Sequence, residues 1–167
     1  ALMSNLEGVE RIDYIIAHHA EQDHSGAIPV VMRKYPEAKV LASPKGKDML
    51  VDHLNIPEDR IAIANDGEVL TLGNKTIEFL HTPWVHWPET MSTYLREDKI
   101  LFTCDLFGSH LATTKVFAGE DEKVCEEAKR YYAEVMMPFR AQIKKHMERF
   151  ALYDVRMIAP SHGPVYD

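Results

Sequence analysis

Short apolar runs alternate with amphipathic stretches along the first third of the chain. Residues 12–17 form a β-branched and aromatic run that ends abruptly in a polar cluster, which is typical of a buried strand leading into a loop. The same reasoning predicts a helix from Ser25 to about Pro36, a strand at 38–42, a helix at 45–54 and a strand at 60–64. Repeated strand–helix–strand units predict a layered α/β fold.

The pattern changes after residue 65. Asp66-Gly67 and Gly73-Asn74 are turn signals that bracket two short strands, so this part of the sheet should be antiparallel and the sheet as a whole mixed. Helical periodicity then dominates a long stretch near the C-terminus, within which Pro138 should kink or divide the helix. The predicted elements are strands at 69–72, 76–80, 100–104 and 155–159, and a helix at 121–154.

Composition places the chain among ordinary globular domains. It has 167 residues, of which 46% are hydrophobic and 27% charged. It shows no repeat or flexible linker, so we predict one domain over residues 1–167. The formal net charge of -7 argues against a nucleic-acid partner. No apolar run is long enough to span a membrane, and the only two cysteines are Cys104 and Cys125. We therefore expect a cytoplasmic location without membrane attachment.

Nine histidines are the compositional feature that needs explaining, since imidazole is the commonest metal ligand in proteins. Four potential ligands follow the strand at 12–17 within six residues: His19, Glu21, Asp23 and His24. The alternative interpretation is a solvated turn in which Asp23 or Ser25 caps the helix that follows. The density of ligand types favours a metal-binding loop.

Three further predicted strand ends each supply a potential ligand. His86 follows the strand at 76–80, Asp105 ends the strand at 100–104, and His162 follows the last strand. Such ends can converge at one edge of a layered sheet. Together with the first cluster they provide enough ligands for two metal sites, with Asp105 placed to bridge them.

These motifs carry a resemblance. The H-x-E-x-D-H cluster, His86 within HWPETM, the strand before Asp105 and the SHG around His162 resemble the metallo-β-lactamase-like domain of the flavodiiron proteins, also called A-type flavoproteins. The resemblance implies an αββα sandwich with mixed sheets, incomplete at its N-terminus in this chain. It also implies two irons, held by His19, Glu21 and His86 on one side and by Asp23, His24 and His162 on the other, with Asp105 bridging.

The resemblance further implies an oxidoreductase that reduces O2 to water, NO to N2O, or both, with Glu21 and Asp105 as catalytic residues. Electrons would come from a flavin- or rubredoxin-type donor, such as rubredoxin or a flavin reductase. No flavin-phosphate loop is found in the sequence, so FMN is expected only in a flavodoxin domain or partner outside this chain. A homodimer is expected by resemblance alone.

Two other functions stay open from the sequence. The first is a zinc-dependent hydrolase of a thioester, lactam or phosphoester, although hydrolytic zinc members of the superfold carry a histidine where this chain has Glu21. Carboxylate-rich sites favour iron. The second is an O2-binding sensor module. His18 and His81 lie close enough to the ligand loops to be candidates for supporting residues.

Overall fold

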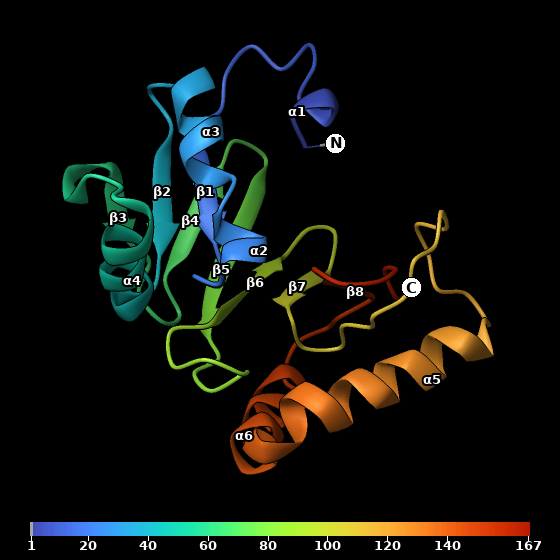
Figure 1. Ribbon diagram of the computed structural model, residues 1–167. Coiled ribbons are helices and arrows are strands. Elements are labelled where there is room, and N and C mark those ends of the chain that lie inside the picture. The colour runs from blue at the N-terminus through green and yellow to red at the C-terminus, as the bar shows by residue number, and fades with distance from the viewer. Residues whose placement is uncertain (1) are drawn as a thin grey trace.

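A parallel sheet forms the N-terminal half of the computed structural model, which describes residues 2–167 (Figure 1). Its strands, in spatial order, are β1 (Tyr14–Ala17), β2 (Lys39–Ala42) and β3 (Ile61–Ile63). Parallel neighbours require crossover connections, and helices supply them here. The helical segments of this half are α1 (Leu2–Asn5), α2 (Gln22–Ser25), α3 (Ile28–Lys34), α4 (Pro44–Leu54) and η1 (Glu58–Arg60).

A five-stranded mixed sheet forms the second half. Antiparallel pairing connects β4 to β7 in sequence order, and β8 then pairs with β7 in parallel. The strands are β4 (Val69–Leu72), β5 (Lys75–His81), β6 (Met91–Leu95), β7 (Ile100–Cys104) and β8 (Met157–Pro160). A helical segment of four parts connects β7 to β8: α5 (Glu122–Tyr131), η2 (Tyr132–Met136), η3 (Met137–Phe139) and α6 (Arg140–Phe150).

Three apolar clusters show how the layers pack. The first joins α3 and α4 to the parallel sheet, with Val40 and Leu50 at most 1% exposed. Another lies between the two sheets and includes Leu41 and Phe79. The third packs α5 and α6 on the outer face of the mixed sheet, where Ile143 is buried. The order is therefore helix, sheet, sheet, helix, which confirms the predicted αββα sandwich (Figure 1).

Several boundaries differ from the sequence prediction. The helix predicted from Ser25 begins only at Ile28, as α3, and a separate short helix, α2, precedes it in the segment predicted as a loop. The strand predicted at 155–159 begins only at Met157, because a turn precedes it. In this turn the Val155 N–H donates a hydrogen bond to the Tyr153 carbonyl oxygen. Neither difference moves a candidate ligand away from its strand end.

The helix predicted at 121–154 is interrupted and ends at Phe150. A wide π-type turn, η2, and a tight 3-10 turn, η3, separate α5 from α6. Pro138 lies in the second of these turns. A proline has no N–H to donate to the preceding turn, so the predicted division of the helix is confirmed.

Four elements are absent from the sequence prediction: α1, α2, η1 and β6. The helix α1 is a single short turn. The strand β6 is central to the mixed sheet, yet it contains Ser92 and Thr93, which are polar and fully buried. Among residues 2–167, no helix combines the length and apolarity needed to cross a bilayer.

Candidate metal centre

The candidate ligands gather where strands of both sheets end. The segment after β1 carries the first cluster, the loop between β5 and β6 carries His86, and Asp105 and His162 follow β7 and β8. A backbone bond from the Met91 N–H to the His18 carbonyl, 3.0 Å long, ties the end of β1 to the start of β6. The two sheets thus meet at this edge, as the sequence predicts.

One group of donor atoms surrounds the first half of the centre. The Nε2 atoms of His19 and His86 lie 3.2 and 3.3 Å from Oε2 of Glu21. Both Nε2 atoms also lie 3.4 Å from Oδ2 of Asp105. Two imidazole nitrogens and two carboxylate oxygens therefore face one point, and these four residues form the His19 group.

A second group repeats this arrangement on the other side of Asp105. Nε2 of His24 lies 3.0 Å from Oδ1 of Asp105 and 3.4 Å from Oδ2 of Asp23. Nε2 of His162 lies 3.3 Å from both of those oxygens. Asp23, His24, His162 and the second oxygen of Asp105 form the His24 group. Asp105 therefore offers one oxygen to each group.

The spacing and the missing hydrogen bonds fit metal ions. Donor atoms bound to one metal at about 2.0–2.2 Å lie roughly 2.8–3.6 Å apart for tetrahedral or octahedral angles, and the separations above fall in that range. Within residues 2–167, both carboxylate oxygens of Asp105 and Nε2 of His24 are buried without a hydrogen-bond partner. A buried carboxylate without donors is costly unless a cation compensates it.

Asp105 is held in its ionised form. Burial by itself would raise the pKa of its carboxyl group, but contacts with the imidazoles of His162, His24 and His86 lower the pKa well below its usual range. An ionised carboxylate with both oxygens unpartnered is a suitable bridging ligand for two cations. The side chain is 1% exposed.

Backbone distortion directs two of the ligands toward the centre. The register of the β7–β8 pair shifts between Phe102 and Cys104, and Cys104 has a φ of 55° immediately before Asp105. Trp84, two residues before His86, has a φ of 68°. Non-glycine residues rarely adopt this left-handed conformation, and residues strained in this way are enriched at functional sites.

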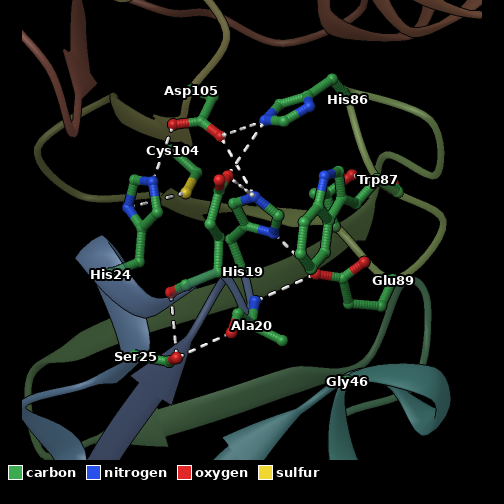
Figure 2. A network of polar contacts seen from close by, with 12 residues as sticks. His19, Ala20, His24, Ser25, Gly46, His86, Trp87, Glu89, Cys104 and Asp105 are labelled. Atoms are coloured by element: carbon green, nitrogen blue, oxygen red, sulfur yellow. Dashed lines mark hydrogen bonds and ion pairs between the residues drawn. The ribbon is translucent and has the colours of Figure 1, made fainter. Parts of the chain in front are cut away.

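The loop after β1 is fixed by Ser25. Its hydroxyl group donates to the carbonyl oxygens of Ala20 and Glu21, at 2.7 and 2.9 Å. Figure 2 shows Ser25 below the loop, with His19 and His24 directed upward toward Asp105. The sequence suggested Asp23 or Ser25 as caps of the next helix, but neither caps it with a side-chain bond. Asp23 and His24 lie with Ser25 in the short helix α2, not in a loop as the sequence predicts, and Ser25 ties this helix to the residues just before it.

Glu89 is a functional candidate that the sequence did not reveal. Its Oε1 lies 2.6 Å from Nδ1 of His19 and accepts a hydrogen bond from the Ala20 N–H at 2.9 Å (Figure 2). Burial by itself would raise the pKa of Glu89, but these two bonds lower the pKa below its usual value. The HWPETM segment contains Glu89, yet only the folded chain shows what it contacts.

Other supporting residues differ from those expected. His18 turns toward Thr93, with 2.9 Å between its Nε2 and the threonine hydroxyl, and His81 contacts the Ala64 carbonyl at 2.8 Å. Among the described residues, these hydrogen bonds direct neither side chain to a member of the His19 group or the His24 group. Behind His24 lies Cys104, whose Sγ is 3.7 Å from His24 Nδ1. Burial and the nearby Asp105 raise the pKa of that thiol, so it stays neutral.

Known proteins are similar to this chain in sequence and in fold. Residues 1–163 match the family described as ODP family beta lactamase. The chain is 32% identical to a nitric oxide reductase of Moorella thermoacetica, over 99% of this chain and 43% of the relative. Among solved structures, the rubredoxin oxygen:oxidoreductase of Desulfovibrio gigas superposes with a TM-score of 0.93 at 27% identity, over 99% of this chain and 43% of that one. The flavodiiron protein of Giardia intestinalis superposes with a TM-score of 0.87 at 32% identity, over 93% and 38%.

The chain spans about two fifths of the length of the curated relatives it matches. The match extends over the whole sandwich and includes every strand that supplies a candidate ligand. The chain therefore belongs to the ODP family of β-lactamase domains and is a metallo-β-lactamase-like domain of the flavodiiron type.

Proposed function

We propose that residues 1–167 form one domain that holds two irons and reduces O2 to water, NO to N2O, or both. The observation that carries this proposal is the pair of donor groups that share Asp105. Relatives whose names describe nitric oxide reduction and rubredoxin-linked oxygen reduction support it. Because the chain is only part of the length of these relatives, the reaction itself is inferred from them.

In this proposal each iron has three residues of its own. His19, Glu21 and His86 hold one iron, Asp23, His24 and His162 hold the other, and Asp105 bridges the two. Glu21 and Asp105 have the catalytic roles. Ferrous iron held by these residues would supply reducing electrons for a diatomic substrate.

The surroundings give the centre one closed and one open side. The side chains of His19 and Asp105 are at most 1% exposed, whereas those of Glu21 and Asp23 are 41% and 51% exposed. The two terminal carboxylates thus mark the side from which a small molecule approaches. The half-buried Trp87 ring packs edge-on against His19, with 5.0 Å between ring centroids.

Electrons reach the centre from outside this chain in our proposal. The donor is rubredoxin or a flavin reductase, and FMN is carried by a flavodoxin domain or partner that these residues do not include. We also propose that the protein works as a homodimer in the cytoplasm. Two free cysteines, Cys104 and Cys125, are consistent with a reducing compartment.

Metal analysis on protein purified without oxygen tests the proposal first. About two irons per chain, with consumption of O2 or NO when a reductant and an electron carrier are added, would support it. The protein would instead be a zinc hydrolase if two zincs per chain persisted after expression in iron-rich medium and the protein hydrolysed a thioester, lactam or phosphoester. Binding of O2 without sustained turnover would instead favour a sensor.

The variant Asp105→Ala tests the bridging role. It removes the one residue that both groups share, so we expect loss of both irons, or of the magnetic coupling between them, together with loss of activity. Asp66→Ala, which removes an exposed carboxylate paired with Arg149, is the control and should retain both irons. Unchanged iron content and activity in Asp105→Ala would contradict the assignment.

A further inference from the structure

The two donor groups are equivalent in composition. Each contains two imidazole Nε2 atoms, one oxygen of a terminal carboxylate and one oxygen of Asp105. The direct ligands therefore give no reason for one position to bind a cation more tightly than the other. A difference can come from how deeply each group is buried and from the residues that contact the ligands from behind.

We propose that Glu89 makes the two metal positions unequal, so that the His19 group binds a divalent cation more tightly and fills first. The inference rests on the proposed metal centre. In this role Glu89 is a positioning residue, because it touches His19 and not the metal.

Glu89 determines which nitrogen of His19 carries the proton. Oε1 of Glu89 already accepts the Ala20 N–H, and an ionised carboxylate can only accept hydrogen bonds. At 2.6 Å, Nδ1 of His19 must therefore be the donor. The lone pair is then left on Nε2, the atom that faces Glu21 and Asp105. A carboxylate behind a metal-bound imidazole fixes its tautomer and makes it a stronger ligand.

Glu89 itself is held rigidly. The residue is 3% exposed, and its backbone carbonyl accepts a 2.5 Å bond from the hydroxyl of Ser43. Ser43 also caps α4, since its Oγ accepts the Gly46 N–H at 3.1 Å. The first turn of α4 lies next to Glu89 (Figure 2). A Cβ atom placed at Gly46 in this turn would lie 3.8 Å from Glu89 Cγ and 3.1 Å from Ser43 Oγ, so little space is left behind Glu89. The carboxylate therefore keeps its orientation before any cation binds.

No other candidate histidine has such a partner. Nδ1 of His24 faces the neutral thiol of Cys104 at 3.7 Å. Among the described residues, His24, His86 and His162 contact carboxylates through Nε2. No carboxylate of the described residues lies within 4 Å of their Nδ1 atoms. The negative charge and the fixed tautomer thus belong to the His19 group alone.

Zinc is a suitable probe because it binds the same N and O donors without redox chemistry. We would titrate the metal-free chain with Zn²⁺ against a competing chelator. The wild type should bind two equivalents in two separate steps. His86→Ala, which truncates only the His19 group, should remove the tighter step, and His162→Ala should remove the weaker one.

Two substitutions at Glu89 separate charge from orientation. Glu89→Ala should weaken the tighter step by about 10–100-fold, the usual effect of losing such a partner, and leave the weaker step unchanged. Glu89→Gln keeps an oxygen that can accept both hydrogen bonds, so it should lose less affinity. Glu78→Gln is the matched control, since Glu78 accepts bonds from Arg96 and Tyr153 in the mixed sheet, and both steps should stay as in the wild type.

The outcomes separate the inference from the proposed function. Equal affinities for the two equivalents, or an equal weakening of both steps in Glu89→Ala, would overturn the role of Glu89 and leave the metal centre intact. A wild-type chain that binds no zinc and no iron would overturn both. Circular dichroism and the urea midpoint of each metal-free variant show that a loss of affinity does not come from unfolding.

Discussion

The two halves of the metal centre differ in burial, although the H-x-E-x-D-H sequence presents them almost as a repeat. Each ligand of the His19 group is less exposed than its counterpart in the His24 group. The exposed side-chain fractions are 0% for His19 against 11% for His24, 18% for His86 against 28% for His162, and 41% for Glu21 against 51% for Asp23. The two groups thus have the same types of donor atom but differ in how far their side chains are buried.

Different parts of the fold support the two halves. Behind the His19 group lie the parallel sheet, the start of α4 and the loop before β6, linked through Glu89 and Ser43. The His24 group relies on the turn after β8, where the Ser109 N–H bonds to the His162 carbonyl at 3.1 Å. The donor set decides which cations fit, and the supporting contacts decide how firmly each position is held.

The largest expected effect is the loss of one half at a time. His86→Ala and His162→Ala each remove an imidazole from one group and leave Asp105 in place. We expect each variant to bind one metal ion per chain, at the weaker position in His86→Ala and at the tighter position in His162→Ala, measured by elemental analysis at a fixed free metal concentration. If either variant lost both ions, the two halves would form one indivisible site, and the comparison between them would fail.

Gly163→Ala should disturb the His24 half next most strongly. Gly163 has a φ of 80°, and a Cβ atom there would lie 2.0 Å from the Ser109 hydroxyl oxygen. Strain of this kind costs ~2–3 kcal/mol of unfolding free energy, measurable by urea denaturation. Gly119→Ala is the control, because its φ is also positive but no atom lies within 4 Å. A cost no greater than that of the control would show that the turn can relax.

Ser43→Ala should affect the His19 half more weakly. It removes the cap of α4, which costs about 1 kcal/mol of stability, and it releases the backbone of Glu89. Asp121→Ala removes the corresponding cap of α5 and should cost a similar amount. Only Ser43→Ala should lower the affinity of the tighter metal position, measured by chelator competition. Equal metal affinity in both variants would mean that the cap does not help to hold Glu89.

Cys104→Ser should produce the smallest effect. It exchanges one neutral group behind His24 for another, so the affinity of the weaker position should change by less than the ~10-fold expected for loss of a charged partner. Cys125→Ser, at an exposed position, should leave both positions unchanged. A larger loss in Cys104→Ser would show that the thiol supports His24 as Glu89 supports His19.

Much of the fold and the candidate ligand set could be predicted because the relevant signals are local. The β-branched runs that become β1 and β7 end directly before polar residues, and strand ends in a layered sheet converge. The structure brings the other six candidate ligands together in two groups on either side of Asp105. Their role in binding iron stays a prediction until metal content is measured.

The features that escaped prediction depend on distant contacts. Glu89 lies 70 residues from His19 in sequence, so no local pattern connects them. Ser92 and Thr93 break the apolar pattern of β6, and the strand is defined by its backbone pairing with β5 and β7, which no local pattern reveals. The division of the long C-terminal helix was predicted because Pro138 acts within its own turn.

The convergence of ligands from four strand ends links cation supply to the stability of the whole domain. Two cations bound by the His19 group and the His24 group, which share Asp105, would join segments near opposite ends of the described chain. Binding to the folded state alone adds about 2.7 kcal/mol at a free cation concentration 100 times the dissociation constant. The unfolding temperature should therefore rise and fall with free metal. A shortage of the bound cation would then shorten the lifetime of the folded protein in the cell.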